Sequence, residues 1–121
     1  MDKWSEDELK RKEMVKNGYA VVANLHRDKN LIEWVHENDK YIYIGRPASR
    51  PKWIVQGGFN WGNPIKNGSR DSMCDRFAEY FRGNKDMQNH LLKLRGKVLL
   101  CFCYPKRCHG NILATAANGL G

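Results

Sequence analysis

A short apolar run followed at once by a cysteine-rich turn constrains the fold of this chain more than any other feature. Val98-Leu99-Leu100 is typical of a buried strand, and residues 111–117 are typical of a helix. Between them, residues 101–110 read Cys-Phe-Cys-Tyr-Pro-Lys-Arg-Cys-His-Gly. In open α/β sheets, ligands bind at the edge where such strand-to-helix turns lie. The turn is therefore the first candidate for a functional site.

The N-terminal region predicts a polar helix. Ser5 and Glu8 form a capping box, which predicts a helix over residues 5–16 that ends at Gly18. Because the segment 1–17 is almost entirely polar, we expect this helix to lie at the periphery.

Two strands precede a long irregular section. Residues 19–25 and 41–44 are rich in β-branched and aromatic side chains and predict strands, with a short helical pattern at 31–35 between them. Residues 47–69 are rich in glycine and proline, and a loop of this length in a small domain is typically functional or mobile. Aromatic side chains distinguish the section from a disordered linker (Trp53, Phe59 and Trp61).

Two helical patterns precede the last strand. The first is an amphipathic helix that begins at Ser69 or Asp71 and ends at Gly83, with apolar side chains at helical spacing (Met73, Phe77, Tyr80 and Phe81). A shorter one ends at Gly96 (Met87, Leu91 and Leu94). This alternation predicts one α/β domain over residues 1–121. We expect a small Rossmann-like layer structure, with helices flanking a short, at least partly parallel sheet.

Positive charge is concentrated in the second part of the chain. Residues 1–40 carry 8 Lys/Arg and 9 Asp/Glu, whereas residues 41–121 carry 13 and 4, so the net charges are −1 and +9. This asymmetry favours a polyanionic or phosphorylated partner, although a basic surface also serves solubility alone. Arg70, Arg76 and Arg82 are spaced by six residues, so they do not form one stripe along a helix. This spacing indicates a solvated surface. The common DNA-binding motifs are absent from the sequence.

Composition also indicates where such a chain works. No apolar run approaches the about 20 residues of a membrane span, and the charged start lacks the apolar block of a signal peptide. We therefore expect a cytoplasmic protein without a membrane partner.

Three of the four cysteines lie within eight residues, which is poor spacing for disulfides that join distant parts of a fold. Such a cluster is typical of metal binding, catalysis or packing.

Three ordered motifs give the chain a resemblance to a known family. They are Tyr43-Ile44-Gly45-Arg46-Pro47, then Trp61-Gly62-Asn63-Pro64, then Gly96-Lys97 leading to Cys101-x-Cys103-x-Pro105-x-x-Cys108-His109-Gly110. In this order they resemble the domain of unknown function 4326 family, found in phages and bacteria, over residues 41–118. The resemblance implies the α/β architecture and, for a phage-encoded member, the host cytoplasm. It implies no particular reaction.

The cysteines of the turn admit several interpretations. Cys101 and Cys103 share a face of the strand, and Cys108 and His109 begin the next helix. The four side chains could therefore form a Cys3His zinc site, although their spacing in the sequence is tight for one metal ion. Alternatively, Cys108 or Cys103 is a reactive thiolate, because a helix N-terminus and nearby cations lower a thiol pKa, and His109 is its general acid or base. A third interpretation is that Cys101 or Cys103 simply packs in the core.

The same turn also predicts an anion-binding site. The N-terminus of the last helix offers N–H groups, Gly110 lets a ligand approach the backbone, and the two cations of the turn add charge. Arg46 follows the neighbouring strand and could clamp a phosphate, unless it pairs with an acidic side chain such as Asp71 or Asp75.

The Trp-Gly-Asn-Pro motif predicts an ordered turn near this site. Trp61 could stack on a nucleobase or close over the core, and the sequence favours neither. Asn63 could hydrogen-bond a base edge or a sugar.

We therefore predict that the chain binds and processes a nucleotide or related phosphorylated ligand, in a phage within nucleic-acid metabolism. The catalytic candidates are His109, Cys108 and Cys103. The ligand-binding candidates are Gly45, Arg46, Trp61, Gly62, Asn63, Lys106, Arg107 and Gly110. No metal ligand is assigned, and zinc is the one candidate cofactor. The alternatives are a non-catalytic basic module for nucleic acid or a host protein, and a small zinc-binding protein.

Overall fold

The predicted strands form a three-stranded parallel sheet. In this computed structural model, which describes residues 4–46, 49–54, 59–65 and 67–119, the strands are β1 (Val21–Asn24), β2 (Tyr41–Tyr43) and β3 (Val98–Cys101). Their order is β1-β3-β2, and both pairings are parallel. All of β3 is buried, as expected for the central strand of a parallel sheet. The predicted α/β class with a short parallel sheet is confirmed.

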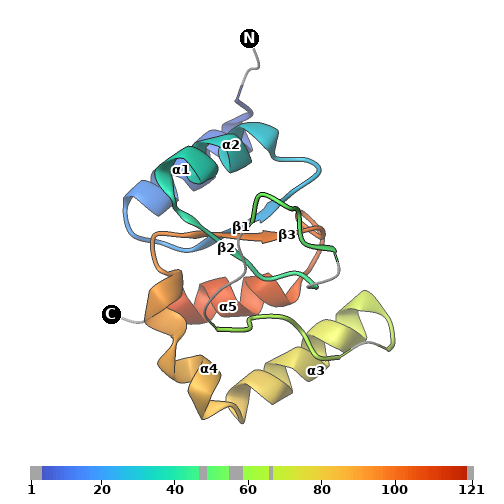
Figure 1. Cartoon of the computed structure of the whole chain (residues 1–121). Coiled ribbons are helices and arrows are strands. Elements are labelled where there is room, and N and C mark those ends of the chain that lie inside the picture. Colours follow the sequence, from blue (N-terminus) through green and yellow to red (C-terminus); the bar gives the residue numbers. More distant parts are fainter. Residues whose placement is uncertain (1–3, 47–48, 55–58, 66, 120–121) are drawn as a thin grey trace.

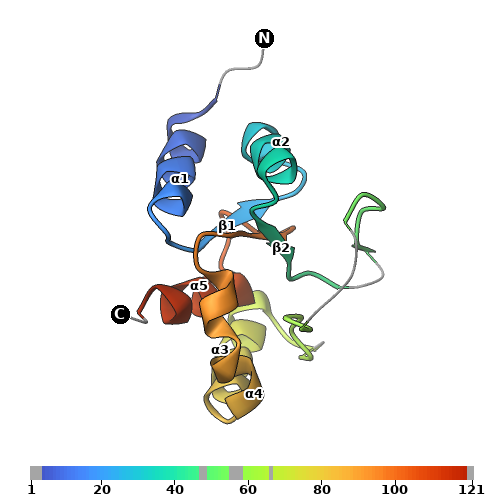
Figure 2. The same ribbon diagram turned by 60° about the vertical axis from the view of Figure 1, so that its left-hand side comes forward.

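Helices cover both faces of the sheet. Figures 1 and 2 show α1 and α2 on one face, and α3, α4 and α5 on the other. The helices are α1 (Glu6–Lys16), α2 (Lys29–Asn38), α3 (Arg70–Arg82), α4 (Lys85–Asn89) and α5 (His109–Asn118), with a short 3-10 helix, η2 (Leu91–Leu94), after α4. Ser69 is the N-cap of α3, and its hydroxyl accepts a hydrogen bond from the Ser72 N–H. No helix in the described ranges is long and apolar enough to cross a bilayer.

The alternation of side chains along β3 divides the core into two clusters. Val98 and Leu100 pack with the side chains of α1 and α2, whereas Leu99 and Cys101 pack with those of α3 and α5. Cys101 is only 2% exposed, so its thiol lies inside the second cluster.

The irregular section connects β2 to α3, and part of it belongs to the core. Ile54 and Trp61 are 2% and 3% exposed. Residues 47, 48, 55–58 and 66 of the section lie outside the described residues. The expectation of an ordered section therefore holds for the residues that carry its aromatic side chains.

Helix α1 is not peripheral, although its polarity predicts that it is. Its capping box is present as predicted, but Glu8 and Arg11 are only 6% and 5% exposed. Arg11 makes a bidentate ion pair with buried Asp28, with N–O distances of 2.9 and 3.1 Å, and also donates to the Val22 carbonyl. Glu8 accepts a hydrogen bond from the Leu31 N–H. A buried polar stripe therefore joins α1 to α2 and the sheet.

The Arg11–Asp28 pair gives the first prediction. Arg11→Ala removes the buried partner of the Asp28 carboxylate and leaves it only the half-exposed Arg27, 3.2 Å away, so we expect a loss of about 3 kcal/mol in the free energy of unfolding, measured by urea denaturation. The exposed pair of Arg82 and Glu79, 3.0 Å apart, is the matched control. Arg82→Ala should cost less than about 1 kcal/mol. Equal losses in the two variants would contradict this account of α1.

Gly110 allows α5 to pack tightly on the sheet. A Cβ at this position would lie 2.6 Å from Ile44 Cδ1 and 3.2 Å from Val22 Cγ2, and both residues are in the core. The glycine therefore serves the contact of helix and sheet, and a methyl group there would force the Ile44 side chain or the start of α5 to shift.

Gly110→Ala should consequently destabilise the fold through overpacking, by about 1–3 kcal/mol in a denaturation experiment. The control is Gly83→Ala, since a Cβ at Gly83 would meet no atom closer than 3.9 Å. If the free energy of unfolding of Gly110→Ala equalled or exceeded that of Gly83→Ala, the contact with Ile44 would relax without cost.

Candidate functional site

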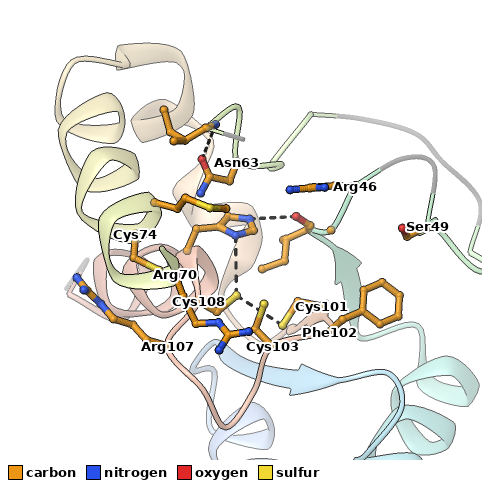
Figure 3. A pocket seen from close by; sticks show the side chains of 15 residues that line it. Arg46, Ser49, Asn63, Arg70, Cys74, Cys101, Phe102, Cys103, Arg107 and Cys108 are labelled. Carbon is orange, nitrogen blue, oxygen red and sulfur yellow. Dashed lines mark hydrogen bonds between the residues drawn. The ribbon is translucent and has the colours of Figure 1, made fainter. Parts of the chain in front are cut away.

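The carboxyl ends of the three strands meet beside a cavity of about 370 Å³, a volume in the range of small-molecule sites. Most of the predicted site residues line it (Gly45, Arg46, Asn63, Cys103, Arg107, Cys108 and His109). Figure 3 shows these side chains around the cysteine-rich turn. The turn and the end of β2 therefore share one cavity, as the position of Arg46 after the neighbouring strand led us to expect.

Three sulfur atoms form the floor of this cavity. Cys101 ends β3, Cys103 lies in the turn, and Cys108 is the N-cap of α5. The Cys101 and Cys108 sulfur atoms are 3.6 Å apart, and the Cys108 sulfur also accepts a hydrogen bond from the Gly110 N–H. All the cysteines of the described chain are free thiols. Cys103 is the one of these three that is half-buried, and so the one open to a ligand.

Cys103 has the lowest pKa of these three thiols. Its pKa lies far below the ordinary thiol value, first because of its side-chain hydrogen bonding with Cys101 and Cys108 and then because of the nearby charge of Arg70. The pKa values of Cys101 and Cys108 are raised, because hydrogen bonding with the neighbouring sulfur atoms and burial both favour their neutral thiols. The sequence suggested a lowered pKa for Cys108 from its helix position, and the structure corrects this: its thiol partners outweigh the helix dipole.

His109 is oriented by two backbone carbonyls. Its Nε2 lies 3.0 Å from the Ile44 oxygen and 3.2 Å from the Trp61 oxygen. Because carbonyls only accept, Nε2 carries the hydrogen, and the lone pair on Nδ1 faces the Cys108 sulfur at 3.8 Å. Burial lowers the pKa of the imidazole despite these hydrogen bonds, so the ring is neutral near pH 7. A neutral imidazole with its lone pair toward a thiol has the geometry of a general base.

The cations of the site differ from those expected. Arg107 forms ion pairs with Asp75 at 2.7 Å and Asp71 at 3.2 Å, so its charge is largely neutralised within the protein. These carboxylates therefore do not pair with Arg46. In the described part of the chain, no carboxylate or carbonyl is bonded to the guanidinium of Arg46 or Arg70, and both side chains line the cavity.

Arg70 was missed by the sequence analysis, which placed it on a solvated surface. The signal that could have found it is topological. In a parallel strand–helix unit, the helix after a strand begins near the carboxyl edge of the sheet, and Arg70 is the first residue of α3. The same argument applies to Cys74, one turn further along α3, which also lines the cavity.

Four predicted ligand-binding residues do not line this cavity. Trp61 is 3% exposed and packs against Phe59, so it closes over the core and is not available to stack on a nucleobase. Gly110 is buried against the sheet, where it serves packing and not the approach of a ligand. Gly62 donates its N–H to the Asn60 side chain, and Lys106 is exposed outside the cavity. Trp61 still contributes through its backbone oxygen on His109.

Asn63 lies on the wall of the cavity opposite the sulfurs. Its side-chain oxygen accepts a hydrogen bond from the Ile65 N–H at 2.9 Å, which fixes the amide and leaves its NH2 group as the donor for a ligand. The zinc interpretation gains no ligand set, because no group of three or more His, Cys, Asp or Glu side chains within the described ranges is arranged to hold a metal ion.

Comparison with known proteins identifies the family. The family model described as "Domain of unknown function (DUF4326)" matches residues 23–119, so the chain belongs to that family. The match includes all three strands except the first two residues of β1, and it leaves out α1.

One curated relative comes from a bacteriophage. The "Uncharacterized 12.4 kDa protein in nrdA-td intergenic region" of Enterobacteria phage T4 is 36% identical over 72 residues, which cover 54% of this chain and 67% of that protein. No solved structure matches the chain.

The charge on Cys103 can be tested by alkylation. A thiol with the ordinary pKa of about 8.5 gains reactivity about tenfold per pH unit between pH 6 and 7.5, because only the thiolate attacks. Since the pKa of Cys103 is lowered far below this range, its labelling by iodoacetamide should be nearly independent of pH there, as measured by peptide mass spectrometry.

Cys101→Ala is the matched variant, because it removes the donor that contributes most to the lowered pKa. Labelling of Cys103 in this variant should regain part of the ordinary pH dependence. A tenfold rise per pH unit in the unmodified protein would place the charge elsewhere.

Proposed function

We propose that the cavity binds a small phosphorylated ligand of the nucleotide class and that Cys103 reacts with it as a nucleophile. The observation that carries the proposal is one cavity that holds a cysteine of lowered pKa, Cys103, and two arginines, Arg46 and Arg70, whose guanidinium groups have no hydrogen bond or ion pair with another described residue. Arg46 follows β2, Arg70 begins α3, and both line the cavity. An arginine can bind phosphate oxygens in a bidentate manner.

Neutral groups would orient the rest of the ligand. The Asn63 NH2 group is a donor for a sugar or base oxygen. Gly45 also lines the cavity, and the Tyr43 ring occupies the place that a side chain at Gly45 would take. The cavity volume of about 370 Å³ suits part of a nucleotide rather than a polymer. The net positive charge of residues 41–121 also attracts an anionic ligand toward the protein.

The reaction that we propose is a nucleophilic displacement. The Cys103 sulfur forms a bond to an electrophilic atom of the ligand, and the leaving group departs with the electron pair of the broken bond. His109 lines the same cavity, with its Nδ1 lone pair free of any backbone donor, and is the group that would accept a proton from the ligand during this step. Because His109 is neutral near pH 7, it can take this role at physiological pH.

Removing either cation should weaken binding of the ligand. Charge-assisted hydrogen bonds contribute about 1.5–3 kcal/mol, so Arg46→Ala and Arg70→Ala should each lower the affinity for nucleoside monophosphates by about 10- to 100-fold in calorimetry. Arg82→Ala, an exposed arginine at the other end of α3, is the control and should bind as the unmodified protein does.

The chemical step has its own readout. Incubation with a panel of nucleotides should give a product detectable by mass spectrometry, and Cys103→Ser should abolish it while binding persists. Failure of every nucleotide and sugar phosphate to bind, with tight binding of DNA instead, would favour the basic nucleic-acid module.

A further inference from the structure

A second hollow lies beside the cavity at the same edge of the sheet. This groove, of about 620 Å³, is open to solvent and runs along the α2 side of the strand ends. Its walls include Leu25, which follows β1, and Ile32 from α2, together with Trp53 from the section after β2. Neither the candidate catalytic groups nor the predicted anion-binding residues line it.

The groove and the cavity share a boundary. Ser49 and Phe102 line both. Phe102 stands between Cys101 and Cys103 in the chain, and Figure 3 shows its ring directed away from the sulfur atoms. The turn after β3 therefore presents sulfur on one side and an aromatic ring on the other, so one molecule could contact both across this turn.

The walls of the groove suit a planar ring. The His26 and Phe102 rings are tilted against each other with centroids 4.9 Å apart, and Trp53 is held by Tyr41 at 5.3 Å and His36 at 4.5 Å. No charged side chain of the described residues lines the groove. Aromatic faces of this kind stack on nucleobases, and stacking contributes about 1–3 kcal/mol per base.

The position of Arg46 indicates that the planar ring belongs to a ligand that also carries a phosphate. Arg46 and Ser49 both line the cavity (Figure 3), and the Ser49 N–H donates to the Arg46 carbonyl at 3.0 Å, so a phosphate held by Arg46 is close to the shared boundary. A base joined to that phosphate through a sugar would extend over Ser49 and Phe102 into the groove. The Ser49 hydroxyl is exposed there and can hydrogen-bond the sugar.

We propose that this groove binds the nucleobase of a nucleotide whose phosphate lies in the cavity. The inference rests on the proposed function and adds a site to it: the phosphate and the base occupy separate hollows joined at Ser49 and Phe102. The ligand is then a mononucleotide, recognised at both ends, and not a sugar phosphate alone.

The test compares a nucleoside 5′-monophosphate with ribose 5-phosphate in calorimetry. With the base bound in the groove, the nucleotide should bind about 5- to 100-fold more tightly. Phe102→Leu keeps an apolar side chain but removes the aromatic face, and His26→Ala removes an exposed ring. Both should lower the nucleotide affinity at least fivefold, and His26→Ala, whose ring lines only the groove, should leave ribose 5-phosphate unchanged. Tyr80→Leu, which changes an exposed ring on α3 outside both hollows, is the control.

The outcomes separate the two proposals. Equal affinity for the two ligands, or a nucleotide affinity insensitive to Phe102→Leu and His26→Ala, would overturn the base site and leave the phosphate site standing. Absence of binding by both ligands would overturn the proposed function and the base site together. A loss of ribose 5-phosphate affinity in His26→Ala would show that a side chain of the groove also holds the phosphate, which contradicts two separate hollows.

Discussion

The parallel pairing of β3 with both neighbouring strands is the constraint on which the rest of the structure depends. Because β3 is central and parallel to β1 and β2, the three strands all end at one edge. The connections that leave this edge lead to helices on opposite faces, with α2 on one side and α5 on the other. In open α/β sheets, such a divergence opens a crevice at the strand ends. The cavity and the groove occupy the two sides of this crevice.

The cysteine-rich turn is held from both sides of the sheet. On the N-terminal side, Asn24 donates to the Phe102 and Tyr104 carbonyls at 3.2 and 2.8 Å, and the Tyr104 hydroxyl donates to Asp7. On the other side, Arg107 holds the turn to the start of α3 through two carboxylates. Neither face alone fixes the turn, so α1, which lies outside the family match, contributes to the geometry of the site.

The sequence allowed the elements and the place of the site to be predicted because both follow from local patterns. Apolar runs, caps and glycines mark the strands and helices, and strand ends of a parallel sheet must meet. The pairing of charges could not be predicted in this way. Arg107 and Arg46 look equivalent in the sequence, yet only Arg107 meets Asp71 and Asp75, since these carboxylates lie on α3 beside the turn. Likewise, the anionic character of Cys103 depends on two thiol donors whose approach is set by tertiary packing.

The charges of the cavity also restrict how a phosphate can lie in it. An anionic Cys103 repels a phosphate and attracts the same guanidinium groups that would bind it, and Arg70 already stabilises the sulfur. Arg46 is then the cation with most charge to offer, since Arg107 is engaged by two carboxylates. A phosphate on Arg46, away from the sulfur, lies next to Ser49 at the boundary with the groove. Electrostatics and the shape of the sheet edge thus favour the same placement, with the electrophilic atom of the ligand, and not its most negative group, turned toward Cys103.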